Sequence, residues 1–598
     1  MEIMKKYYNI IKVAMIAALP LICSCEKYLE KPAQGVLNDQ NLSTKKGINA
    51  LLIGAYAALD GVSSGTTAVG GGGASWAASP SNFLQGSIAG GEAHKGAGGG
   101  SEIPMIPYQR WNAMDASNPY LNTKWKAGYA GIARANAVLK ALPNVTDISE
   151  AEKKSIEAQA RVLRSHFYFD LKKNFNMIPW IDENNMSDYA TPNDKDIWPN
   201  IEADFQFGLD NLPELYSGET GRINKWAAAS YLGKTYLYEK KYQEAKAIFD
   251  QVIEQGKTSN GLKYDLVPNY HDNFDAATEN NSESVFVVQM VPNIGTNDVS
   301  NSNGGDLLNY PVTIFSCCGI FIPSQDFVNS FSTDDNGLPY LDTYNQHAVN
   351  SDQGLNSDQA FTPDEEPIDP RLDWSVGRRG IPYLDWGVHP GKAWIRDQAE
   401  AGPYSPIKNV HMQATQDEYA NYTGWAPGNA INLNIIRFAD VLLMAAEAEL
   451  HLGNLGKAEE YVNQIRNRAA NPASWVYKYA DESKPTGPRS NIPAAHYVIN
   501  PYPIGAFAAG GKEFALKAVY FERKLELGLE GHRYYDLSRW GIAGDFMNAY
   551  YQYESPLTTD LIGASFTKGK NDFYPIPQAQ IDLTTSNANS SLKQNPGY

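Results

Sequence analysis

Apolar residues recur at helical spacing in several separate blocks of this chain. Between Lys46 and Leu59 one stripe carries Ile48, Leu51, Leu52, Ala55, Tyr56 and Leu59. The same period predicts helices over residues 120–142, 149–174, 201–254, 435–470 and 512–540. Leu212-Pro213 splits the block at 201–254, and Gly453-Asn454 splits the block at 435–470. The pattern predicts a mainly α protein built from helix pairs.

One of these blocks fits a known repeat. Leu232-Gly233-x-x-Tyr236 followed by Ala245-x-x-x-Phe249 has the spacing of a tetratricopeptide helix-turn-helix. Gly233 and Ala245 are small enough for two helices to approach, and the two rings fill the space between them. Such repeats bury their faces only by stacking on neighbours. Several degenerate copies are therefore expected, about four pairs in all, with residues 435–470 as one of them.

The segments between the helical blocks have a different character. Residues 61–118 begin rich in glycine, and residues 261–430 are rich in Asn, Asp, Gly, Pro and aromatics, with short strand-like runs such as Ser284–Val291. Long irregular segments in a compact protein are usually functional or disordered, and the tryptophans here favour order and function. We predict helical parts at 40–60, 119–260, 430–470 and 512–545. Loop-rich, ligand-binding parts are predicted at 61–118, 261–430 and 471–511, with a C-terminal segment at 546–598.

The N-terminus resembles a bacterial export signal. A short apolar run follows three lysines, Lys5, Lys6 and Lys12. It ends in Leu21-Ile22-Cys23-Ser24-Cys25. This ending is typical of a lipoprotein signal peptide over residues 1–24, with Cys25 as the acylated residue. An ordinary secretory signal is the alternative. Bacterial lipoproteins carry several acyl chains, so the mature protein would remain on a membrane.

Two further cysteines, Cys317 and Cys318, are neighbours and do not form a disulfide framework. A bond between them is possible but strained. We expect two free thiols.

Composition limits the class of partner. The chain of 598 residues has 36 tyrosines, 12 tryptophans and a net charge of −17. Phosphate binding needs a positive surface, so this charge argues against nucleic acid. It fits a neutral or weakly charged ligand and mildly disfavours strongly anionic polysaccharides.

Catalytic signatures are missing from the sequence. It has no His-Glu-x-x-His, no phosphate-binding glycine loop and no Gly-x-Ser-x-Gly elbow. We therefore predict no catalytic residue, metal or cofactor. A surface glycoside hydrolase stays as an alternative, because the separation of two carboxylates is not visible in a sequence.

The segment from Glu522 to Trp540 carries acids, arginines and a histidine together and resembles an active site. Glu522 and Glu526 share a helix face, and Gly531 can end that helix. We interpret the segment as a buried charge network that fixes helix packing.

Several motifs then occur in a characteristic order. They are Cys25-Glu-Lys-Tyr-Leu29, Gly54-Ala-Tyr56, Ala160-Arg-Val-Leu-Arg164-Ser-His-Phe-Tyr168 with Ile178-Pro179, Ile436-Arg437 through Asp440 to Glu447-Ala448, Ile465-Arg466-Asn-Arg468-Ala469, the charged segment, Tyr574-Pro-Ile-Pro577 and Gln594-Asn-Pro-Gly-Tyr598. Together they resemble the SusD/RagB family of outer-membrane nutrient-binding lipoproteins over nearly the whole chain.

The resemblance implies a body of four tetratricopeptide-like helix pairs, with an irregular remainder that carries the ligand site. It also implies a lipid-anchored protein on the outer face of the outer membrane. Its partner would be a SusC-type TonB-dependent transporter, on which it acts as a lid. The ligand would be an oligosaccharide or polysaccharide, or alternatively a peptide, which family members bind without cleaving.

Sugars are recognised by aromatic rings together with polar groups that fix the hydroxyls. The resemblance implies that ligand contacts come from the loop after the first helix and from the irregular insertion. The ligand-binding candidates there are Trp76, Asn82, Glu92, His94, Lys95, Trp374, Arg378, Arg379, Tyr383, Asp385 and Trp386.

Overall fold

The computed structural model describes residues 42–61, 74–98, 100–188, 190–292, 301–586 and 589–598. The predicted signal peptide and Cys25 lie outside the described residues. Over the described part of the chain, no helix is long and apolar enough to cross a membrane.

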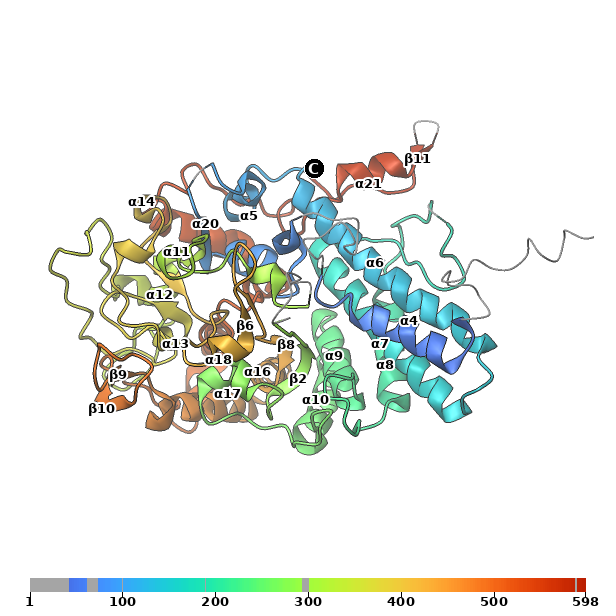
Figure 1. Cartoon of the computed structure of the whole chain (residues 1–598), viewed down its shortest axis with the longest axis horizontal. Helices are drawn as coiled ribbons and strands as arrows, with labels where there is room; N and C mark the ends of the chain where they lie inside the picture. Colours follow the sequence, from blue (N-terminus) through green and yellow to red (C-terminus); the bar gives the residue numbers. More distant parts are fainter. Residues whose placement is uncertain (1–41, 62–73, 99, 189, 293–300, 587–588) are drawn as a thin grey trace, which may run out of the picture.

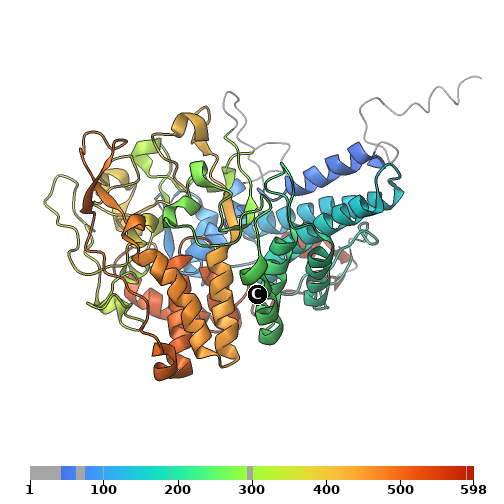
Figure 2. The ribbon, with the colours of Figure 1, turned by 90° about the horizontal axis from the view of Figure 1, so that it is seen from below.

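A continuous array of helices forms the body. In order along the array these are α4 (Lys45–Tyr56), α6 (Pro119–Ala141), α7 (Glu150–Phe175), α8 (Trp198–Asn211), α9 (Lys225–Tyr238), α10 (Tyr242–Gln255), α16 (Phe438–His451), α17 (Leu455–Ala470) and α18 (Ala506–Glu526). Each helix packs against the next, including α10 against α16, which are far apart in the sequence. Figures 1 and 2 show this array, with α16 to α18 beside the green helices α9 and α10. The fold is mainly helical and tetratricopeptide-like, as the sequence predicts.

Helix boundaries follow local signals. The Ser149 hydroxyl accepts from the Glu152 N–H at the start of α7, and Thr44 and Asn224 cap α4 and α9 in the same way. α8 ends just before Leu212-Pro213, as expected. The predicted repeat is the pair α9 and α10, in which a Cβ at Gly233 would lie 2.6 Å from the Phe249 ring.

One predicted boundary is wrong. Residues Leu433–Arg437 form strand β8, not the start of a helix, because they pair with β2 (Ser284–Val288). Here tertiary pairing replaces the helical period. The predicted helix start at residue 512 is confirmed. Within α18, Gly511 has φ +78° and ψ 176°, and this break separates a short helical segment, which begins at Ala506, from the main helix.

The other half is loop-rich and contains short elements. Its short helices include η2 (Ser75–Ala78), η3 (Phe83–Ile88), α5 (Ile106–Arg110), α11 (Val312–Phe315), α12 (Gln325–Asn329), α13 (Leu372–Ser375), α14 (Gln398–Ala401) and α15 (Gln416–Tyr419). Its two-stranded antiparallel sheets are β1 (Ala93–Gly96) with β3 (Ile320–Pro323), β4 (Val376–Gly377) with β5 (Ser405–Pro406), β6 (Ala420–Asn421) with β7 (Gly428–Asn429), and β9 (Tyr477–Tyr479) with β10 (Arg489–Pro493).

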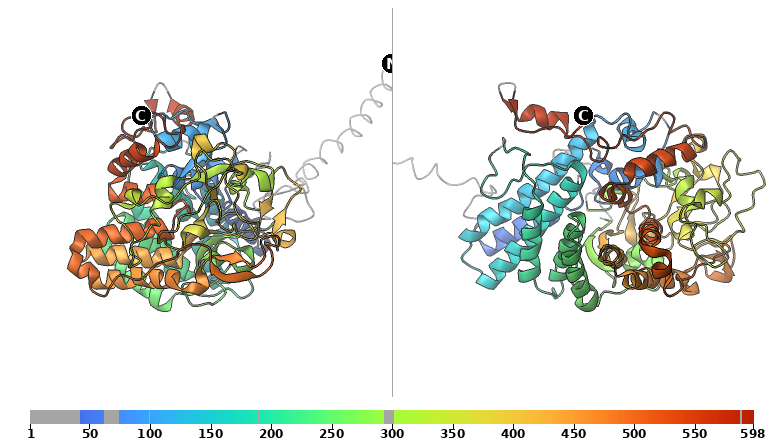
Figure 3. Two further views of the ribbon diagram at one scale, coloured as in Figure 1. Left: turned by 90° about the vertical axis from the view of Figure 1, so that its left-hand side faces the viewer. Right: turned by 180° about the vertical axis from the view of Figure 1, so that it is seen from behind.

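The C-terminal part returns over the loop-rich half and the first helices. It contains α19 (Arg533–Trp540), α20 (Ala543–Glu554), α21 (Gln578–Leu583) and the hairpin of β11 (Thr585–Ser586) and β12 (Asn589–Ser590). Figure 3 shows it from behind, running from α20 to α21 across the top of the molecule. The buried Tyr574 hydroxyl donates to the Gln85 carbonyl, which ties this segment to η3.

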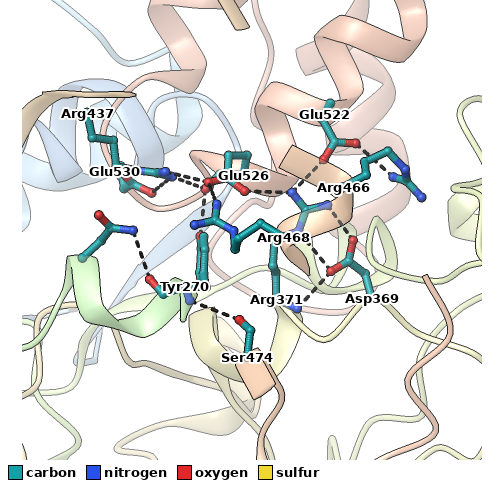
Figure 4. Close-up of polar contacts among 12 residues, drawn as sticks. Tyr270, Asp369, Arg371, Arg437, Arg466, Arg468, Ser474, Glu522, Glu526 and Glu530 are labelled. Atoms are coloured by element: carbon teal, nitrogen blue, oxygen red, sulfur yellow. Dashed lines mark hydrogen bonds and ion pairs between the residues drawn. The ribbon is translucent and has the colours of Figure 1, made fainter. Parts of the chain in front are cut away.

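Buried ion pairs join the two halves (Figure 4). The Glu526 carboxylate on α18 pairs with Arg437 at 2.6 Å, with Arg371 at 2.9 Å and with Arg468. These arginines come from β8, the loop before α13 and α17. Glu522 pairs with Arg371 and Arg466 in the same cluster. The charged segment is therefore a structural network, as the sequence analysis predicts.

The sulfurs of Cys317 and Cys318 form a disulfide in this structure. The expectation of two free thiols is therefore wrong.

Candidate ligand-binding surface

Two tryptophans from distant segments meet at the surface of the loop-rich half. Trp76 lies in η2, and Trp425 lies in the turn between β6 and β7. Their ring centroids are 6.5 Å apart, with the planes at 85°. The Trp425 side chain is 55% exposed. An exposed ring beside a second tryptophan is a candidate binding surface. We call Trp76 and Trp425 the aromatic platform.

Polar groups fix the orientation of Trp76. Its indole N–H donates to the Glu102 carboxylate at 3.0 Å and lies 2.9 Å from the Tyr120 hydroxyl. That hydroxyl also donates to the Glu102 carboxylate. Burial, reinforced by Glu102, raises the pKa of Tyr120, so the phenol stays protonated. The platform therefore has a rigid side and a carboxylate within reach of it.

A second exposed aromatic residue lies in the turn that carries Trp425. Tyr422, in the same turn, is 48% exposed, and its hydroxyl lies 2.7 Å from Nε2 of His411. Burial lowers the pKa of His411 to about 4, so this imidazole is neutral at physiological pH. Beneath it, the Trp386 indole N–H donates to the His411 carbonyl at 2.8 Å. The exposed turn thus stands on an ordered aromatic layer.

This arrangement suits a flat ligand with hydroxyl groups. Exposed rings can pack against the apolar face of a sugar, while a carboxylate and phenols at the edge accept or donate hydrogen bonds. Over the described residues, no group of three or more His, Cys, Asp or Glu side chains could hold a metal ion.

The structure brings one sequence-predicted residue, Trp76, into the platform. Two further candidates, Trp374 and Trp386, are half-buried with their indole N–H groups bonded inward. Trp374 donates to the Ser474 carbonyl and stacks on His271 at 4.7 Å. Both tryptophans therefore support loops from beneath in this structure.

The candidates in the loop after the first helix are buried and bonded within the protein. The Asn82 carbonyl accepts from Lys124 at 2.8 Å, His94 lies 2.9 Å from Glu554, and the Lys95 ammonium donates to three backbone carbonyls. The Glu92 carboxylate accepts from the Leu529 N–H at 3.0 Å. In this structure the polar groups named above are therefore engaged by the protein itself.

The candidates in the insertion hold its loops together. Arg378 forms a buried ion pair with Asp373 at 2.6 Å, and Asp385 accepts from two consecutive backbone N–H groups, those of residues 413 and 414. The buried Tyr383 hydroxyl donates to the Pro406 carbonyl, and the half-exposed Arg379 donates to loop carbonyls. Cationic, aromatic and acidic residues alternate in this segment because they bond to one another and to the backbone of neighbouring loops.

Sequence reasoning did not select Trp425, Tyr422, Tyr120 or Glu102. A signal was present for Trp425, because it stands in Gly424-Trp425-Ala426-Pro427-Gly428, a turn that offers a large ring little to pack against. No local signal links Glu102 or Tyr120 to Trp76, since that contact exists only in the folded chain.

Comparisons with known proteins agree with this fold. A family model described as SusD family matches residues 282–598, and one described as starch-binding associating with outer membrane matches residues 102–237. SusD-like protein P25 of Formosa agariphila is 26% identical over 445 residues, which cover 73% of each chain.

Solved structures are similar in fold. A SusD superfamily protein from Bacteroides vulgatus superposes with a TM-score of 0.64 at 22% identity, covering 92% of this chain and 99% of that one. Surface glycan-binding protein A from Bacteroides thetaiotaomicron, solved with laminarihexaose, gives a TM-score of 0.61 at 19% identity, with coverages of 92% and 99%.

Proposed function

Because this chain belongs to the SusD family, we propose that it is a cell-surface glycan-binding protein that delivers oligosaccharides or polysaccharides to a SusC-type TonB-dependent transporter. In this proposal the protein is a lipoprotein anchored through Cys25 to the outer membrane, facing the exterior. The match to a family described as associating with the outer membrane supports that location.

The observation that carries the proposal is the aromatic platform. Trp76 and Trp425 stand nearly perpendicular, with Trp425 largely exposed and Trp76 fixed by Glu102 and Tyr120. Rings at this angle can contact two faces of a bent or helical glycan. We propose that ligand contacts also come from Tyr422, and that the protein binds its ligand without cleaving it.

Calorimetric titration tests this proposal. The protein starting after Cys25 would be titrated with laminarihexaose, the ligand in a structure of similar fold, and then with a panel of polysaccharides. Trp425→Ala and Trp76→Ala are each expected to cost about 2 kcal/mol, roughly 30-fold in Kd, because a central aromatic anchor is lost. Tyr477→Ala, on β9 outside the platform, is the matched control and should leave binding unchanged.

Other outcomes would redirect the proposal. Saturable heat with peptides and none with any glycan would favour a peptide-binding member of the family. New reducing ends released from a glycan would favour a surface glycoside hydrolase. Unchanged affinity in both tryptophan variants would refute the platform as the site.

A further inference from the structure

A polar cavity lies where the first helices meet the loop-rich half. Its lining comes from α6, α7 and α9 and from residues 80–82 and 530–535. Its volume is about 60 Å³, several times the roughly 10–15 Å³ that one water molecule needs. Tyr120, which holds Trp76, and Lys124, which lines the cavity, are one turn apart on the same face of α6. The cavity therefore adjoins the aromatic platform but is separate from it.

Three lysines from three different helices line this cavity. Lys124 and Lys173 both pair with Asp170, at 2.7 and 2.9 Å. Lys234 pairs with Asp440 at 3.0 Å, and Asp440 is shared with a guanidinium, that of Arg523, at 2.8 Å. Arg523 is itself balanced by Asp536, at 2.9 Å. Three ammonium groups are thus left with two carboxylates.

The remaining acid of the cavity wall does not compensate for them. Glu530 lines the cavity, but its two carboxylate oxygens are engaged by Arg437 and Lys408, at 2.8 and 2.7 Å. The histidines of the wall, His166 and His532, are held neutral, because burial lowers their pKa values to about 3 and about 4. The local charge is therefore positive, although the whole chain carries −17.

The hydrogen-bonding groups of the cavity also favour a negatively charged ligand. The Asp170 carboxylate accepts from Lys124, Lys173 and Asn82, and the Asn82 carbonyl accepts from Lys124. A lysine ammonium has three N–H donors. In the described part of the structure, Lys173 and Lys234 each make one ion pair, and the Lys173 ammonium also lies over the Tyr535 ring, 4.2 Å from its centroid. The cavity thus has spare donors, while these acceptors are occupied.

Repulsion among the lysines affects their pKa values. Burial lowers the pKa of Lys124 and of Lys234. Asp170 and Asp440 act in the opposite direction, and the charge of Lys173 lowers both values. A bound anion would relieve that repulsion, and a neutral ligand would not.

We propose that this cavity binds an oxyanion, a sulfate, phosphate or carboxylate group held by the ammonium groups of Lys124, Lys173 and Lys234. The group is either a free anion or a charged substituent of a glycan that lies on the neighbouring platform. In the second case the cavity gives the protein a preference for sulfated or uronic-acid glycans.

Calorimetry at constant ionic strength tests the inference, with the protein starting after Cys25 titrated with sodium sulfate and with sodium phosphate. Saturable binding is expected, and Lys173→Met should weaken it at least tenfold while Asp170 keeps Lys124. Lys153→Met, which removes a surface ion pair with Glu150 on the same helix, is the matched control. Lys234→Met tests the opposite wall independently.

A second titration separates the two sources of the anion. A sulfated or uronic-acid oligosaccharide is compared with its neutral parent, and a gain that Lys173→Met abolishes identifies the glycan substituent. Binding of free anions without such a gain identifies a free-anion site. Trp425→Ala should leave free-anion binding intact, which separates this site from the platform.

The inference is overturned if neither anion binds saturably and the charged glycan gains nothing. It is equally overturned if binding persists in both Lys173→Met and Lys234→Met.

Discussion

At the scale of single residues, burial decides which polar side chains can serve a ligand. Glu92 is a candidate contact by its position in the sequence, yet the structure buries it, and its carboxylate accepts from the Leu529 N–H. Burial raises the pKa of Glu92 to about 7, from an ordinary value of 4.5, although Ser87 and Arg533 act in the opposite direction.

Glu92 should therefore make stability depend on pH. Between about 4.5 and about 7 the folded state binds the proton and the unfolded state releases it, so the free energy of unfolding falls as pH rises. The amide in the Glu92→Gln variant cannot ionise, so this variant does not lose that stability as pH rises. The difference of about 2.5 between the two pKa values, at 1.36 kcal/mol per unit, gives on the order of 3 kcal/mol.

Urea unfolding at pH 5 and pH 8 measures this effect. The stability of Glu92→Gln relative to the natural protein should be higher at pH 8 than at pH 5. Glu482→Gln, in an exposed loop, should show no such difference. The same relative stability of Glu92→Gln at both pH values would contradict the argument.

At the scale of elements, small residues set the distance between helices. A Cβ on Gly131 of α6 would lie 2.5 Å from the Phe167 ring of α7, and one on Gly128 would lie 2.7 Å from Leu171. The two helices can therefore pack closely only because these positions lack a side chain. Gly54 of α4 differs, because a Cβ there would meet nothing within 4 Å.

The same substitution should consequently have opposite effects at two helical glycines. Gly131→Ala is expected to cost about 1–3 kcal/mol, because the added methyl group displaces Phe167. Gly54→Ala should stabilise the protein by about 0.5–1 kcal/mol through helix propensity alone. Urea unfolding of both variants measures the two effects, and a stabilising Gly131→Ala would show that α6 and α7 can separate freely.

At the scale of the whole molecule, the buried ion-pair network connects the helix array to the loop-rich half. Glu526 lies at its centre (Figure 4). Burial opposes the ionisation of Glu526, but Arg468, Arg437 and Arg371 outweigh it and hold the pKa of its carboxyl well below the ordinary value. Removing this charge leaves buried guanidinium groups without a partner.

Glu526→Gln is therefore expected to destabilise the protein by about 3–5 kcal/mol. The stability that the carboxylate provides is present above about pH 4.5 and is lost as pH falls, so the gap between variant and natural protein should narrow in acid. Glu460→Gln, which breaks an exposed pair with Lys457, should cost less than about 1 kcal/mol. Calorimetric melting at pH 7 and pH 4 measures both variants, and a gap that widens in acid would contradict this role.

The sequence by itself determined the helices, the repeat and the function of the charged segment. These features depend on signals that act over a few residues, namely apolar periodicity, caps such as Ser149 and breaks such as Leu212-Pro213. Such signals can be recognised from the sequence alone. The motifs from residue 436 onward also indicated the family.

Only the tertiary structure decided which loop residues face solvent. Trp76 and Trp425 are far apart in the sequence but lie side by side in the fold. In the same way, three lysines from α6, α7 and α9 line one cavity. The inward-bonded Trp374 and the exposed Trp425 lie in the same long irregular stretch of the sequence. Irregular loops have no period from which to read the direction of a side chain, so their surfaces are set by long-range packing.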